Sequence, residues 1–366
     1  MDGERDMVML AVPFAAGVAA GAFLTQKLPP TSPASWFLPA TALPAAVALT
    51  CLFARKERGP AAFFLPFLML GLFCLSSYSL LPANEDGGWR FAKDACEALK
   101  GRIRALPFRD PRSPGMVLAL LTGDKSSLSR ATVTTFRDSG AAHILALSGL
   151  HLGIIYSIIR RAFAFAGNSP RARGFRCAAT IAATLFYTIM TGAGPSIVRA
   201  FLFISISEIS TISPGRRRSP LRVLAASLTV QLALKPDVIG NAGFQLSYLA
   251  VLGIVTVFPV LQGFFPGHGS ILNRISPMKR IWDAAALSIS CQLFTAPLAW
   301  YRFHSFPRYF LLTNILALPL STATMALSVA AIALSAAGIC PGVLVKAVEW
   351  CTGTLLSVLE TISSMG

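Results

Sequence analysis

The sequence predicts an all-α polytopic integral membrane protein with about ten transmembrane helices, some broken or re-entrant, and one outer-face amphipathic helix. Of its 366 residues, 54% are hydrophobic and only 13% are charged, about half the charged fraction of an ordinary soluble domain. The apolar residues form long blocks, and about 20 such residues cross a bilayer core as a helix. Clusters of arginine and lysine separate the blocks, as in the cytoplasmic loops of membrane proteins.

The blocks are assigned in chain order from their lengths and flanking charges. Basic clusters at 55–58, 160–176, 216–222 and 274–280 each fall where the number of preceding spans requires a cytoplasmic loop. The N-terminus is therefore expected in the cytoplasm. The first block lacks a basic n-region and a cleavage site, so it is expected to remain as a span. The expected spans are 7–26, 34–54, 60–81, 141–159, 177–193, 197–213, 221–234, 241–260 and 281–300, then two or three helices in 308–362 broken near Pro319 and Pro341.

The stretch 82–113 is too charged to cross a membrane. Apolar residues recur in it at three- and four-residue steps from Trp89 to Leu106, and charged residues fill the opposite face. This spacing predicts an amphipathic helix that lies on the membrane or against the protein, on the outer side. The next block, 114–122, is apolar but too short to span.

The composition argues against several classes of function. The net charge of +16 needs no acidic partner, because loops that orient a membrane protein account for it. The seven cysteines are scattered singly, so the sequence indicates neither a disulfide framework nor a metal site. No G-x-x-x-x-G-K-[ST] motif is present. We therefore expect no cofactor, no catalytic residue and no enzymatic activity.

Polar residues interrupt several expected spans, and ionisable groups at such depth tend to line a pathway. In residues 140–153, His143 and His151 bracket Ser148 and Gly149. For His143, near the outer end, a hydrogen bond at a helix–helix contact is favoured, whereas for His151, nearer the middle, a pathway is slightly favoured. A hydrolase dyad of Ser148 and His151 is disfavoured, because G-x-S-x-G is absent and an i, i+3 pair seldom aligns a nucleophile with its base.

Two further interruptions follow. In residues 192–199, glycine and proline break the helix, and Arg199 lies one turn into the next segment. The N-terminus of a half-helix, together with an arginine, can bind an anion. An equal alternative is that the Arg199 side chain extends to the lipid headgroups. Asn241, Gln245 and Ser247 begin an otherwise apolar helix, where Asn241 is expected to cap the helix and Gln245, if buried, needs partners.

The last interruption lies between residues 297 and 314. Its turn contains aromatic and basic residues, including Arg302 and Arg308, and an interfacial aromatic belt is the default expectation for it. Asn314 lies inside the apolar run that follows.

These motifs, taken in order, resemble those of the ComEC-type competence (DNA internalisation) family. Members of this family form the inner-membrane channel for one strand of incoming DNA. The resemblance implies a competence-type channel domain at 141–366, after three N-terminal helices at 1–82 and a periplasmic amphipathic and connecting segment at 83–140. The similar segments are LLTGDKSSLS (120–129), TFRDSG (135–140), AAHILALSGLHLG (141–153), TGAGPSIVRAFL (191–202), PDVIGNAGFQLSYLAVLGI (236–254) and FTAPLAWYRFHSFPRYFLLTNILALPL (294–320).

The resemblance implies a bacterial inner-membrane location and a path for single-stranded DNA through membrane lipid. The stretch 82–113 is too short for the OB-type domain that the family often inserts. The four histidines form no H-x-H-x-D-H-type motif, so the nuclease is expected elsewhere, as are a DNA receptor and a cytoplasmic motor or strand-binding protein. The candidate path residues are His143, Ser148, Gly149, His151, Arg199, Asn241, Gln245, Ser247 and Asn314, and the candidate outer-face contacts are Arg137, Arg302 and Arg308.

Two other classes of function remain open. A secondary transporter of a small anionic solute would use broken helices and midplane polar residues equally well, although no inverted repeat is apparent. In a non-conducting scaffold, the same polar residues would serve only helix packing.

Overall fold

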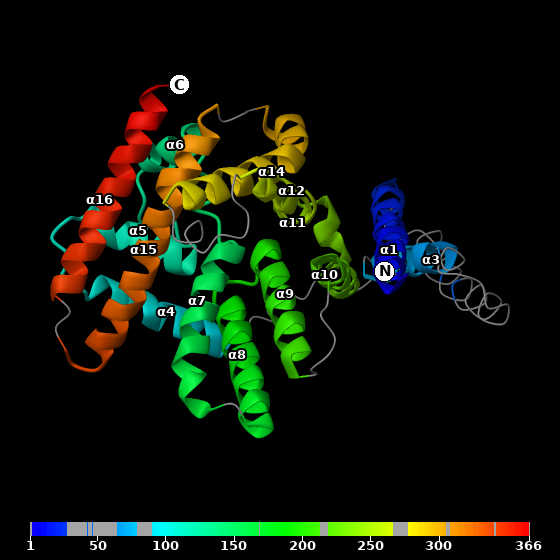
Figure 1. Cartoon of the computed structure of the whole chain (residues 1–366), viewed down its shortest axis with the longest axis horizontal. Helices are drawn as coiled ribbons and strands as arrows, with labels where there is room; N and C mark the ends of the chain where they lie inside the picture. The colour runs from blue at the N-terminus through cyan, green and yellow to red at the C-terminus, as the bar shows by residue number, and fades with distance from the viewer. Residues whose placement is uncertain are drawn as a thin grey trace. The chain divides into compact units, whose positions relative to one another are not determined.

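The computed structural model describes residues 2–27, 42, 46, 64–78, 90–167, 169–212, 219–265, 277–304, 308–339 and 342–365. This part of the chain contains helices and no strand, which confirms the predicted all-α class (Figure 1). It divides into two compact units, residues 1–87 with 202–255 and residues 88–201 with 256–366. The expected span at 34–54 lies outside the described residues, apart from Ala42 and Ala46.

The first unit is built on two closely packed helices, α1 (Asp2–Lys27) and α3 (Phe64–Tyr78). A Cβ added to Gly17 would overlap the carbonyl oxygen of Leu68, and one added to Gly71 would overlap that of Phe14. The two backbones can approach this closely only because glycine occupies both positions, as in small-residue helix contacts within membranes.

The rest of the first unit packs on this pair. It comprises α9 (Pro195–Ile212) from Leu202 onward, α10 (Pro220–Leu234), η3 (Pro236–Gly240) and most of α11 (Ala242–Thr256). The Tyr248 hydroxyl donates to Gln231 Oε1 at 3.0 Å, so a polar contact is satisfied within an otherwise apolar interior. The buried core of this unit consists of Phe14, Val18, Leu75, Leu224, Leu232, Val238, Phe244 and Tyr248.

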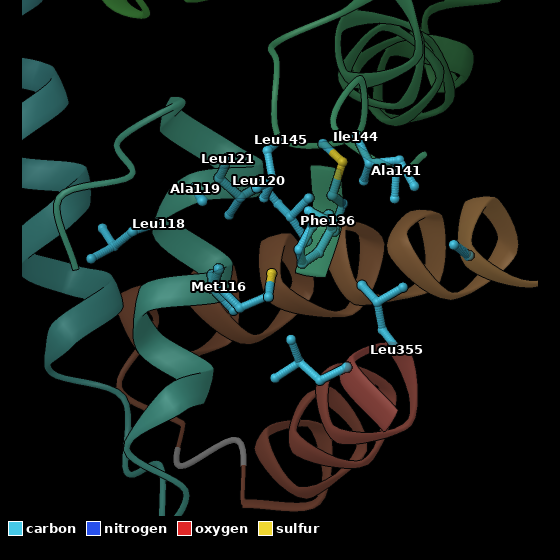
Figure 2. Packing of buried hydrophobic residues seen from close by; sticks show 14 of the residues in the cluster. Met116, Leu118, Ala119, Leu120, Leu121, Phe136, Ala141, Ile144, Leu145 and Leu355 are labelled. Carbon is cyan, nitrogen blue, oxygen red and sulfur yellow. The ribbon is translucent and has the colours of Figure 1, made fainter. Parts of the chain in front are cut away.

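The second unit has its core around α5 (Arg112–Thr122), which is buried from Gly115 to Thr122. The core also takes residues from α6 (Arg130–Asp138) and from the neighbouring pair α15 (Phe310–Ala336) and α16 (Gly342–Ser364), whose helices lie side by side in Figure 1. Figure 2 shows the Phe136 ring beside Leu120 and Leu145, with Leu355 reaching the same core from α16. An apolar helix too short to span is thus the centre of this unit.

The predicted amphipathic helix is present as α4 (Arg90–Arg104). It packs against α5 and α8 (Pro170–Met190), with Ala92 and Ile103 buried. Of the two expected settings, the structure therefore shows the apolar face lying against the protein.

Two predicted helix boundaries are wrong. The block 141–159 was expected to be helical throughout, but α7 begins only at Gly149 and ends at Ala162, followed by η2 (Phe163–Ala166). The helix starts late because Ser148 caps it. The break expected near Pro319 does not occur, since α15 continues through this proline. Proline is tolerated inside membrane helices where neighbouring groups satisfy the freed backbone. The break near Pro341 is confirmed by the end of α15 at Ala336.

The break between α8 and α9 occurs as predicted. The turn uses positive φ angles at Gly192 (87°) and Ala193 (49°), and α9 then begins at Pro195, a residue suited to a first helical turn. The second unit is completed by α12 (Phe258–Gly263) and by α14 (Pro277–Phe303).

The described residues include three segments long and apolar enough to cross a membrane. They support the predicted membrane class, whereas the count of about ten spans remains a prediction. These segments are Ala242–Gly263, Phe310–Ala336 and Gly342–Ser364, and shorter apolar helices cover Met9–Phe23, Leu65–Leu75 and Pro220–Leu234.

Candidate functional site

The N-terminus of α7 is formed by a reciprocal cap between Ser148 and His151. The Ser148 side chain accepts from the N–H of Leu150 at 3.3 Å, and His151 Nδ1 accepts from the N–H of Ser148 at 3.3 Å. This is a capping box with histidine in the place of the usual glutamate. The preceding turn is held by Ile144 and Leu145, which are buried in the core of the second unit. The motif therefore folds as an anchored turn followed by a capped helix.

His151 lies in the first turn of α7, not near the middle of a span as expected from the sequence. Its side chain is almost fully buried, with the residue 1% exposed. Because Nδ1 accepts a backbone N–H, the neutral ring carries its proton on Nε2. Among the residues that the structure describes, this buried Nε2 has no hydrogen-bond partner.

The Ser148 hydroxyl lies 3.0 Å from His151 Nδ1. The i, i+3 pair therefore does come within hydrogen-bond distance, but the same nitrogen receives the Ser148 N–H. In this structure the pair caps a helix. His143 is exposed and lies 3.1 Å, through Nδ1, from the carbonyl oxygen of Gly140. That bond is local to its turn, so the expected helix–helix contact is not seen at this histidine.

Arg199 lies in the first turns of α9, and its guanidinium is close to the start of α7. A Cβ added to Gly149 would be 3.5 Å from Arg199 Nη2 and 3.5 Å from the Cβ of Ala200. Arg199 is only 8% exposed, so its charge is buried against α7. Two motifs that are about fifty residues apart in the sequence therefore meet at one place.

Helices α14 and α15 extend this polar region. The Arg199 guanidinium lies near enough to the Cys291 thiol of α14 to interact with it electrostatically. One turn earlier on α14, the Ser288 hydroxyl accepts from Asn314 Nδ2 of α15 at 3.3 Å. Asn314 Oδ1 is buried and has no partner among the described residues. We call this group the Arg199 cluster, made of Ser148, Gly149, His151, Arg199, Ser288, Cys291 and Asn314.

The helices of the Arg199 cluster carry two acidic residues, Glu208 on α9 and Asp283 on α14. Neither aspartate nor glutamate occurs in residues 139–159, 191–207, 284–303 or 309–336. The buried guanidinium lies beside the start of α7, which is the positive end of the helix dipole. Such an arrangement can bind an anion.

The structure places the other candidate path residues in the first unit. Asn241 Oδ1 accepts from the N–H of Phe244 at 3.2 Å, which confirms its expected role as the N-cap of α11. Gln245 Nε2 donates to the carbonyl of Ile239 at 2.7 Å, whereas its buried Oε1 has no partner among the described residues. Ser247 is half-buried on α11.

The three candidate outer-face arginines are exposed in the second unit. Arg137 lies in the last turn of α6, and Arg308 precedes α15. These two helix ends are joined, because Thr313 Oγ1 donates to the carbonyl of Ser139 at 2.7 Å. Arg302 lies at the end of α14.

The sequence interpretation missed three residues. Ser288 and Cys291 gave no signal, because serine and cysteine are ordinary in apolar helices. Glu208, which is 6% exposed on α9, did give one, since it is a carboxylate inside an apolar block.

Comparison with known proteins supports the resemblance. Residues 120–366 match the family described as Competence protein, a range that contains the whole Arg199 cluster. The chain is 29% identical over 220 residues to ComE operon protein 3 of Bacillus subtilis, covering 58% of this chain and 25% of that protein. It is 25% identical over 213 residues to Competence protein ComA of Neisseria gonorrhoeae, covering 56% and 28%.

A third relative, the uncharacterized protein YcaI of Escherichia coli, is 26% identical over 217 residues, covering 57% of this chain and 27% of that protein. No solved structure matches the chain. The chain spans about a quarter of the length of these three relatives. Because the family match extends over well more than half of its residues, the chain belongs to the competence protein family.

Proposed function

We propose that this chain is part of a channel that carries single-stranded DNA across a bacterial inner membrane during natural transformation. Membership of the competence family implies a role in DNA uptake. The observation that supports a path through this chain is the burial of Arg199 against the N-terminus of α7.

The physical requirement is to replace the water around each phosphate as the strand crosses. A charge in bare hydrocarbon is strongly unfavourable, so hydrogen-bond donors and positive charge must line the route. Arg199 and the α7 N-terminus supply both, and aromatic side chains can stack with bases without sequence preference. The protein acts as a passive conduit in this proposal, with no catalytic residue.

The proposed setting is a multi-pass protein of about ten spans with a cytoplasmic N-terminus. Arg137, Arg302 and Arg308 face the outside and gather the strand. A separate receptor delivers the DNA, a separate nuclease removes the other strand, and a cytoplasmic motor or strand-binding protein pulls the strand inward.

The decisive experiment measures the entry of labelled single-stranded DNA into the cytoplasm with and without this chain. Uptake should require the chain and should fail in Arg199→Ala and His151→Ala strains in which membrane insertion is verified. Lys346→Gln provides a control, because it removes one exposed positive charge from α16, away from the Arg199 cluster. Normal transformation by both cluster variants would contradict the assigned path.

A second candidate function is the transport of a small anionic solute. The observation that favours it is the same break at Gly192–Pro195 beside a buried arginine, a geometry that also suits a compact anion. A transporter would give saturable uptake of the solute into vesicles and would not respond to DNA. A scaffold would show neither activity.

A further inference from the structure

The segment from Leu106 to Ser139 runs along the length of the hairpin that α15 and α16 form. Near the start of α15, Thr313 Oγ1 donates to the carbonyl of Ser139. Near the turn between α15 and α16, Leu106 forms a small buried cluster with Ala331 and Val345. Thr313 and Ala331 lie about 27 Å apart along α15, at 1.5 Å per residue. This length is close to the thickness of a bilayer core, about 30 Å.

Helix α4 ends directly before Leu106, so the depth of its C-terminal end follows from this cluster. Both α15 and α16 are long and apolar enough to cross a membrane, which places the C-terminal end of α4 toward the opposite membrane surface from Thr313. Figure 1 shows α4 extending from α15 and α16 to α8, on which it packs. An α4 on the outer surface, as expected for residues 83–140, would carry the turn of the hairpin out of the membrane with it.

Two different surfaces of α4 are exposed in the second unit. Phe91 is 75% exposed and lies beside Phe186 of α8, which is 38% exposed, with the ring centroids 5.7 Å apart. Exposed apolar groups that gather in this way mark a contact with lipid or protein. The other surface is a stripe of exposed charged residues at steps of three, four and seven residues, which a helix brings to one side. This stripe consists of Arg90, Lys93, Asp94, Glu97 and Arg104.

The charged stripe is incompatible with contact to lipid. Ionisable side chains at the depth of the hydrocarbon core are strongly disfavoured, and those that occur there almost always face the protein interior or a water-filled space. The apolar side of α4, with Ala92 and Ile103 buried, already packs on the protein. The stripe lies on the opposite side of the helix, which leaves water as the surroundings that its charges require.

We propose that the charged stripe of α4 lies within the depth of the bilayer and faces water. Resting on the proposed function, this stripe is one wall of the aqueous route that the strand follows. Its three basic and two acidic side chains leave it weakly positive. Such a wall attracts a polyanion without holding it at one place, as passage requires.

The experiment measures the surroundings of single spin labels on α4, with the full chain in lipid nanodiscs. The seven native cysteines are replaced, and a nitroxide is attached at Glu97→Cys or at Phe91→Cys. Two relaxants are compared, molecular oxygen, which concentrates in lipid, and a water-soluble nickel chelate. Arg171→Cys, exposed at the basic end of α8, is the reference for water, and a lipid labelled on its acyl chain is the reference for the bilayer core. Thermal unfolding in the same discs verifies that each variant is folded.

The label at Glu97 should collide mainly with the nickel chelate, and the label at Phe91 mainly with oxygen. Asp94→Cys, one turn before Glu97 on the same stripe, should repeat the result of Glu97→Cys and replaces it where that variant does not fold. Nickel access at both Glu97 and Phe91 would place α4 outside the bilayer and overturn the proposal. Oxygen access at Glu97, or access of neither relaxant, would also overturn it, because the stripe would then face lipid or protein.

A second measurement separates this inference from the proposed function. Lys93→Glu reverses one charge of the stripe and should reduce the entry of labelled single-stranded DNA on the order of tenfold. Lys235→Glu, which reverses one exposed charge in the first unit, is the control and should leave DNA entry unchanged. If the labels behave as expected but inserted and folded Lys93→Glu admits DNA normally, the water-facing position stands and its place in the DNA route is wrong. If DNA entry does not require the chain at all, the proposed function is wrong, whereas the label result stands.

Discussion

The Lys100 ammonium lies 2.8 Å from the Asp124 carboxylate and joins the amphipathic helix α4 to the loop after α5. Their side chains are only 16% and 20% exposed, so solvent screens this pair less than a surface pair. Asp124 Oδ1 also accepts the N–H of Ser126 at 3.0 Å. The carboxylate is therefore held from both sides, and the polar side of α4 is fixed to the turn that follows the buried helix α5.

Removing the negative charge of Asp124 should weaken the packing of α4 against the rest of the second unit. Asp124→Asn is expected to lower the stability of the α4 contact by about 1 kcal/mol, near the upper end for a salt bridge that is not deeply buried. Hydrogen–deuterium exchange of residues 90–104 measures the change. Glu97→Gln is the control, because Glu97 contacts the same lysine at 2.9 Å but its side chain is 66% exposed. Equal effects of the two substitutions would contradict the role given to Asp124.

The same pair predicts how α4 responds to pH. Hydrogen bonds from Lys100 and then Ser126 hold the pKa of Asp124 well below its usual value. The contribution of Asp124 is therefore present above about pH 4, its unfolded pKa, and is lost as pH falls below it. Asp124, followed by Glu97, raises the pKa of Lys100, so the lysine contribution is present below about pH 10 and is lost as pH rises further.

After correction for the intrinsic pH dependence of amide exchange, the protection of residues 90–104 should therefore fall below about pH 4 in wild-type protein. The part of this acid response that comes from the pair should be missing in Asp124→Asn. An identical acid response in the two proteins would show that other carboxylates control the docking of α4.

The close crossing of α1 and α3 predicts that alanine substitution lowers the thermal stability much more at Gly17 than at Gly21, although both glycines lie on α1. Gly17→Ala places a methyl group against the backbone of α3, at Leu68, which must move. Overpacking of this kind costs about 1–3 kcal/mol, so the melting temperature in detergent should fall. Gly21→Ala, one turn later, meets only leucine side chains at 3.2–3.3 Å, which can adjust. A larger loss from Gly21→Ala would be incompatible with this crossing.

Much of the helical pattern was predictable, since apolar blocks and flanking charges depend only on local sequence. The blocks at 197–213 and 221–234 correspond closely to α9 and α10, whereas α8 begins at Pro170, seven residues before the block at 177–193. The start of α7 was not found this way. Hydropathy continues across Ser148, whereas the helix begins at the cap that this serine forms with His151.

The candidate site was predictable in its parts and not in its assembly. Charge and helix-breaking residues identified Arg199, and the polar residues of 140–153 identified His151. No spacing rule relates Gly149 to Arg199, because their contact depends on how α7 and α9 pack. Neither of the missed residues on α14, Ser288 and Cys291, differs in type from residues that serve only packing.

Substitutions at Ser148, the N-cap of α7, can separate the effect of helix stability on DNA entry from the effect of charge at the α7 N-terminus. Ser148→Ala should destabilise α7 by about 1 kcal/mol through the loss of a side-chain acceptor. Ser148→Asn and Ser148→Asp both restore such an acceptor, but aspartate adds a negative charge at the α7 N-terminus beside Arg199. We expect both restored variants to insert and fold, with DNA entry retained in Ser148→Asn and strongly reduced in Ser148→Asp. Equal DNA entry in these two variants would argue against an anion path at this end of α7.

The proposed topology depends most on α10, which has only 15 residues and is short for a membrane span. Three expected crossings, by α8, α9 and α10, separate the basic N-terminal turn of α8 from Lys235, so these two places should lie on opposite sides of the membrane. In a variant with the seven native cysteines replaced, an impermeant maleimide should label Lys235→Cys on intact spheroplasts and Arg171→Cys only after lysis. Both positions are exposed within their units, so neither should be hidden from the reagent by the protein. If both cysteines are labelled from the same side, an even number of crossings lies between them, and the span count around α10 must be reduced.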